Sequence, residues 1–113
     1  MKNPDKRDAA VRRVVSAARL IVTYQIGLPV GCQRLSRALY WLSPYEQNLP
    51  TVIDDYMKAV LTLPIGAERL EWDRAALKEK DVALETINQK FRDRIFNTCW
   101  SLLDRFNPTG DSR

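Results

Sequence analysis

The chain has 113 residues, of which 45% are hydrophobic and 28% are charged, and it carries a net charge of +4. This length suits one domain with a single core, and the composition is far from that of disordered chains. No apolar run reaches the roughly 20 residues that a membrane-spanning helix needs, and the charged N-terminus lacks the pattern of a secretory signal. We therefore expect a cytoplasmic protein.

Apolar residues recur every three or four positions along most of the chain, which predicts helices with one buried stripe each. The first helix is expected from about Asp5 to Gln25, and Gly27 is placed to end it in a left-handed turn. Pro29 suits the first turn of a second helix, because its missing N–H would have no partner there. The segment SPYEQNLP, residues 43–50, ends this second helix.

A third helix is predicted in TVIDDYMKAVLTL, residues 51–63, and Pro64 helps to end it. Asp73 is a good N-cap for the next helix. No Gly or Pro occurs between Asp73 and Phe106, so this region is either one long helix or a short helix broken near Asp81 and followed by a longer one.

No segment alternates apolar and polar residues for long enough to form a strand. The sequence therefore predicts an all-α fold, a compact bundle of four to five helices in a single domain over residues 1–113. Residues 1–4 and 107–113 are expected to be frayed tails. The aromatic residues fall at helical spacing and are expected to pack between helices. They are Tyr40, Trp41, Trp72, Phe91, Phe96, Trp100 and Phe106.

The sequence contains no histidine. This excludes Ser-His and Cys-His nucleophile pairs, imidazole proton transfer and two-histidine metal sites. Cys32 and Cys99 are too far apart to suggest a metal knuckle, and both fall in apolar helical patterns, so we expect them to be reduced and buried. The sequence thus predicts no enzymatic activity, no cofactor and no metal ion.

Charge is distributed unevenly along the chain. Residues 1–45 hold eight Lys and Arg against two Asp and Glu, whereas residues 46–85 hold five against nine. A basic face on the first two helices could contact phosphates, although no helix-turn-helix, stacking motif or dense Lys/Arg stripe accompanies it. A solvated surface is the favoured interpretation, and a small basic nucleic-acid-binding or regulatory protein is the alternative. This face is formed by Arg12, Arg13, Arg19, Arg34 and Arg37.

The acidic middle of the chain offers a second surface. Asp54 and Asp55 are adjacent and diverge by about 100° on a helix, so they make a poor metal pair. Carboxylates can instead steer association with a cationic protein, and exposed tyrosines beside them would add a large contact area with few rotatable bonds. An ordinary charged face is the alternative. The predicted contact residues for a basic protein partner, such as a nuclease, are Tyr45, Glu46, Asp54, Asp55 and Tyr56.

Three segments of the chain suggest a family: AARLIVTYQIGLPVGCQRL, LPIGAERLEWDRAALKEKD and FRDRIFNTCWSLL. Over roughly residues 10–104 they resemble a family of small all-helical bacterial proteins of unknown function. The resemblance implies an immunity protein of a contact-dependent growth-inhibition system, which neutralises a cognate toxin domain, often a nuclease, by occluding its active site. No catalytic residues come with it. The matching residues are Ala17, Ala18, Arg19, Gly31, Leu35, Leu63, Pro64, Gly66, Arg69, Trp72, Leu77 and Asp81.

Overall fold

A computed structural model of the chain describes residues 4–106. The described residues form helices and no strand, which confirms the predicted all-α class. The frayed tails predicted at 1–3 and 107–113 lie outside the described residues, whereas Pro4 begins the first helix. The elements are α1 (Pro4–Val22), α2 (Leu28–Leu42), α3 (Val52–Ala59), the 3-10 helix η1 (Ala67–Glu71) and α4 (Arg74–Phe106).

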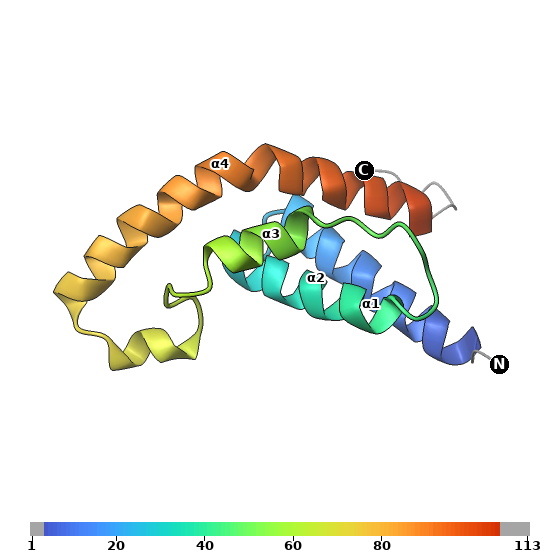
Figure 1. Cartoon of the computed structure of the whole chain (residues 1–113), viewed down its shortest axis with the longest axis horizontal. Coiled ribbons are helices and arrows are strands. Elements are labelled where there is room, and N and C mark those ends of the chain that lie inside the picture. The colour runs from blue at the N-terminus through green and yellow to red at the C-terminus, as the bar shows by residue number, and fades with distance from the viewer. Residues whose placement is uncertain (1–3, 107–113) are drawn as a thin grey trace.

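The helices pack in a closed order, in which α1 contacts α2, α2 contacts α3, α3 contacts α4 and α4 returns to α1 (Figure 1). Each helix contributes its apolar stripe to the space between them, so the spacing that predicted the helices also predicts their buried faces. The fully buried side chains at the centre include Val14, Ile21, Leu35, Leu42, Ile53, Ile95 and Leu102.

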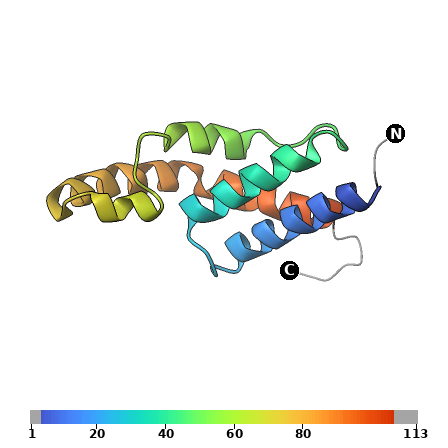
Figure 2. The ribbon, with the colours of Figure 1, turned by 90° about the horizontal axis from the view of Figure 1, so that it is seen from below.

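The last helix, α4, is a single helix of 33 residues, so the alternative of two shorter helices is wrong. Its buried residues begin at Asn88, which means that only its C-terminal half lies in the core. The N-terminal half projects from the bundle with η1 folded back beside it (Figures 1 and 2). We call residues 61–86, which form this projection, the arm. The molecule consequently measures 50 × 29 × 21 Å.

A bidentate ion pair holds the arm together. The guanidinium group of Arg69 donates hydrogen bonds of 2.8 and 3.0 Å to the carboxylate of Asp81, and one of 3.1 Å to the carbonyl oxygen of Pro64. These bonds join η1 to the first turns of α4. Both residues lie in the segments that carry the family resemblance.

The predicted left-handed turn after α1 falls at a different residue. Tyr24 has a φ of 61°, whereas Gly27 has a φ of −67° and is the N-cap of α2. The N–H of Tyr24 donates to the carbonyl of Ile21 and the N–H of Gln25 to that of Leu20, at 3.1 and 3.0 Å, which is the Schellman pattern with Tyr24 at its left-handed position. The prediction for Gly27 was therefore wrong.

The other helix ends agree more closely with the sequence. Pro29 lies in the first turn of α2, as predicted. The carboxylate of Asp73 accepts a hydrogen bond of 2.8 Å from the N–H of Ala76, which confirms it as the N-cap of α4. The third helix is shorter than expected, because α3 ends at Ala59, before the proline that was predicted to end it.

Candidate binding groove between α1 and α2

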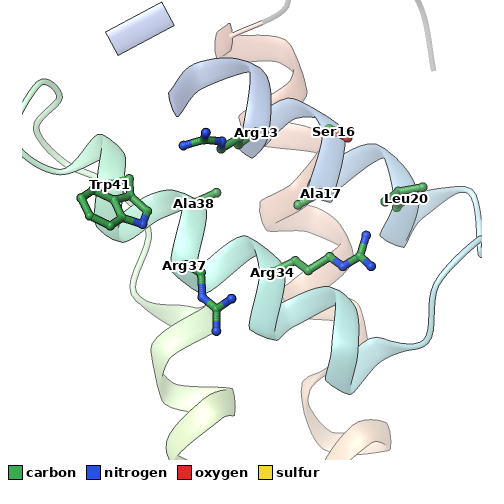
Figure 3. Close-up of a pocket in the computed structure, with 8 residues that line it drawn as sticks. All are labelled: Arg13, Ser16, Ala17, Leu20, Arg34, Arg37, Ala38 and Trp41. Atoms are coloured by element: carbon green, nitrogen blue, oxygen red, sulfur yellow. The ribbon is translucent and has the colours of Figure 1, made fainter. Parts of the chain in front are cut away.

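A surface groove lies between the first two helices, with a volume of about 410 Å³. Each helix lines it with residues at positions i, i+3, i+4 and i+7, which is one face of two consecutive helical turns. We call it the arginine groove. Its residues, drawn in Figure 3, are Arg13, Ser16, Ala17 and Leu20 from α1 and Arg34, Arg37, Ala38 and Trp41 from α2.

Two alanines form the floor of the groove. Ala17 and Ala38 are both buried, one on each helix, where α1 and α2 face each other. A single methyl group at each position leaves space above it that a longer side chain would fill. The hollow is therefore built into the pairing of the two helices.

The rim of the groove is cationic. Arg13, Arg34 and Arg37 are exposed, and their guanidinium groups form no hydrogen bond or ion pair with any residue of 4–106. Arginine carries five N–H donors in a planar arrangement that matches carboxylates and phosphates. Three such groups without an internal partner favour an anionic partner.

Two exposed aromatic rings adjoin the groove. Tyr40 is 71% exposed and Trp41 is 56% exposed, with ring centroids 5.7 Å apart and planes at 79°. The expectation that these rings pack in the core between helices is wrong, because Leu35, Leu39 and Leu42 occupy the buried positions of this part of α2. Both rings lie outside this core-facing stripe, Trp41 at the edge that lines the groove and Tyr40 on the solvent side.

The outcome for the other aromatic residues is mixed. Phe91 is buried, and Phe96, Trp100 and Phe106 pack against the core, as predicted. Trp72 is exposed in the arm and does not belong to the core cluster.

The basic face predicted from the sequence is divided in the structure. Arg13, Arg34 and Arg37 share the arginine groove, whereas Arg12 and Arg19 line a different hollow on α1 that includes Phe106 of α4. The division follows from helix geometry, because adjacent positions such as 12 and 13 point about 100° apart.

Tyr56, a predicted contact residue of the acidic surface, is fully buried, so its expected exposure is wrong. Its hydroxyl donates a hydrogen bond to the amide oxygen of Asn88, and its ring packs edge-on against Phe91 at 5.7 Å. Burial raises the pKa of Tyr56. The short helix α3 lies between α2 and α4, and Tyr56 completes its inner face together with Ile53.

Glu46, from the same predicted surface, is already paired within the fold. Its carboxylate accepts hydrogen bonds from Arg7 at the start of α1 and, at 3.2 Å, from Arg105 near the end of α4. The bond from Arg7, with that from Arg105, holds the pKa of Glu46 below its ordinary value. This network joins both ends of the described chain to the loop between α2 and α3.

The remaining predicted contact residues differ in exposure. Tyr45 is half-buried against the core. Asp54 and Asp55 are exposed on the outer face of α3, as expected, and the hydroxyl of Ser36 donates to Asp54 at 3.2 Å. The acidic surface therefore presents two carboxylates without the tyrosine anchors predicted beside them.

Comparison of the chain with family models, curated proteins and solved structures finds no match. The resemblance to immunity proteins, with the partner that it implies, therefore stays a prediction.

None of the helices in the described part of the chain is both long and apolar enough to cross a membrane. In residues 4–106, no three His, Cys, Asp or Glu side chains are grouped so that they could hold a metal ion.

Cys32 and Cys99 are free and buried, as predicted, and burial raises the pKa of each thiol to about 12. Both thiols therefore stay protonated and are poor nucleophiles at neutral pH.

Proposed function

We propose that the chain is an immunity protein that neutralises a toxin domain by binding it in an equimolar complex and covering its active site, with no chemistry of its own. The observation that supports this is the arginine groove, where the exposed rings of Tyr40 and Trp41 stand beside three arginines with no internal partner. Trp, Tyr and Arg are the residue types that contribute most binding energy at protein interfaces. The resemblance over residues 10–104 supports a toxin as the partner.

The groove also suggests the charge of the surface that it covers. The sequence favoured an acidic contact surface for a basic nuclease, whereas the groove is cationic. Nucleases that use Mg²⁺ hold it with carboxylates, so the active site itself is an anionic feature even where the surrounding surface is basic. A cationic groove complements such a site, and complementary charge steers association and fixes the orientation of the complex.

Co-expression in a bacterial host tests the proposed function. The toxin domain encoded by the neighbouring gene should arrest growth when expressed alone, and the chain should restore growth and form an equimolar complex by isothermal titration calorimetry. Absence of a toxin gene beside this one, or growth arrest that persists with the folded chain present, would contradict the proposal.

The acidic surface remains a second hypothesis for the interface of the same complex. If Asp54 and Asp55 contact the toxin, replacing both by alanine should weaken binding by more than about tenfold. If the arginine groove is the interface, replacing Arg34 and Arg37 by alanine should have that effect, and the aspartate variant should stay within about twofold of wild type. We expect the second result, because the acidic surface lacks its predicted aromatic anchor at Tyr56.

The unpaired arginines also favour a second candidate function, that of a small basic nucleic-acid-binding or regulatory protein. This function predicts binding to DNA or RNA of unrelated sequence, with an affinity that falls steeply as the salt concentration rises, because each arginine–phosphate contact releases counterions. A titration of labelled random-sequence duplex at several salt concentrations, beside the toxin titration, distinguishes the two functions.

A further inference from the structure

The length of the arginine groove matches a short helix. Its lining runs over residues 13–20 of α1 and 34–41 of α2. Seven steps of an α-helix cover about 10 Å, so the groove accommodates about two turns of a third helix. Two packed helices leave a valley between their surface ridges, and an amphipathic helix that lies in such a valley is a common mode of peptide recognition.

The chemistry of the groove defines the face of that helix. The buried methyl groups of Ala17 and Ala38 leave room for an apolar side chain, and Leu20 and Trp41 extend the apolar surface at opposite ends. The ring of Trp41, which is 56% exposed, has apolar surface left to cover. The centre of the partner's face is therefore apolar.

The charges of the groove lie toward its ends. Figure 3 shows Arg13 near Trp41 and Arg34 near Leu20, as the antiparallel pairing of α1 and α2 requires, while Arg37 stands on the outer side of α2. A guanidinium group pairs with a carboxylate through two parallel hydrogen bonds. Carboxylates on either side of an apolar residue, about two turns apart, would meet Arg13 and Arg34 together.

From these observations we infer that the arginine groove binds an acidic amphipathic helix of a protein partner. The inference rests on the proposed function, since it specifies which part of the toxin enters the groove. A nucleic acid fits less well, because the floor is apolar and the next helix, α3, presents Asp54 and Asp55. The hydroxyl of Ser36 on α2 donates a hydrogen bond to Asp54, so this carboxylate lies beside α2 and would repel a phosphate backbone that continues past the groove toward α3.

A matched pair of variants separates the groove from total charge. R34E/R37E reverses two exposed arginines in the groove. R12E/R19E makes the same change of charge at two exposed arginines of the hollow that includes Phe106. None of the four side chains bonds another residue of the described chain, so both variants should fold, which circular dichroism checks.

The experiment is selection of a random peptide library displayed on phage against the intact chain, with counter-selection on R34E/R37E. The enriched peptides should carry two or more carboxylates that flank an apolar residue at helical spacing. Measured by fluorescence anisotropy, they should bind R34E/R37E at least about tenfold more weakly than wild type, and R12E/R19E within about twofold. Ala38→Leu, whose longer side chain fills the floor of the groove, should also weaken binding of these peptides.

In the binding experiments, three results would overturn the inference: no enrichment over the variant, enriched peptides without acidic residues, or a labelled DNA duplex that binds the groove more tightly than the peptides and displaces them. The growth assay separates this from the proposed function. If R34E/R37E still restores growth, the groove inference fails and the immunity function stands. If acidic peptides bind the groove but the wild-type chain does not restore growth, the immunity function fails and the groove inference stands.

Discussion

Gly31 sets the close approach of α1 and α2, and its replacement tests how tightly the two helices pack. A Cβ atom at this position would lie 2.6 Å from Cγ1 and 3.2 Å from Cδ1 of Ile21, and 3.0 Å from Cγ2 of Ile26. Ile21 is fully buried and β-branched, so its Cγ1 cannot rotate away without disturbing the core. We therefore expect G31A to be less stable than the wild-type chain.

Two opposing effects determine how far G31A lowers the free energy of unfolding. Alanine is favoured over glycine within a helix by about 1 kcal/mol, because it loses less backbone entropy on folding. Inserting a methyl group into a well-packed core costs about 1–3 kcal/mol. The difference leaves the free energy of unfolding of G31A about 1 kcal/mol lower than that of wild type.

Urea denaturation followed by far-UV circular dichroism measures this difference, and a double variant tests its cause. I21A alone should cost about 2–5 kcal/mol. In G31A/I21A the new methyl group occupies space that Ile21 has left, so the double variant should be more stable than the sum of the single changes by about 1 kcal/mol. A G31A variant that is more stable than wild type, or strict additivity of the two changes, would refute the steric explanation.

The buried polar contact, the ion-pair network and the arm can each be tested by one substitution. Tyr56→Phe leaves a buried amide oxygen unsatisfied and should lower the free energy of unfolding by about 1–3 kcal/mol in urea denaturation; an unchanged midpoint would contradict this. The pKa of Glu46 is lowered, so the ionised carboxylate stabilises the fold near neutral pH, and this contribution is lost as the pH falls. The difference in unfolding free energy between wild type and E46Q should therefore be largest near neutral pH and should disappear as the pH falls from about 5 to 3. Asp81→Asn breaks the ion pair with Arg69 and should speed proteolysis of the arm while the global midpoint hardly moves. Glu79→Gln is the control on the same helix, and equal proteolysis of the two variants would count against the ion pair.

The helices could be predicted from the sequence because their signals are local. The apolar spacing, the proline at the start of α2 and the carboxylate cap at Asp73 each act within about one helical turn. The turn after α1 was missed because the Schellman hydrogen bonds tolerate a residue other than glycine. Tyr24 takes the left-handed position, and its ring lies 5.4 Å from that of Phe96 on α4, a contact that no local pattern predicts.

The arginine groove was predictable only in part. Arg13, Arg34 and Arg37 belong to the basic face predicted from the sequence. Each helix contributes four residues to the groove at the same helical spacing, i, i+3, i+4 and i+7. Which face of α1 meets which face of α2 depends on how the two helices cross. That crossing places Arg13 in the groove and leaves Arg12 outside it.

The sequence by itself determined the all-α class, the order of the helices and the burial of both cysteines, because periodicity and capping act between neighbours in the chain. Only the tertiary structure decided which charges are used within the fold. Glu46 is bound by Arg7 and Arg105, which lie 39 and 59 residues away in sequence. Arg34 pairs with no residue of the described chain, because contacts over such distances form only where the helices come together.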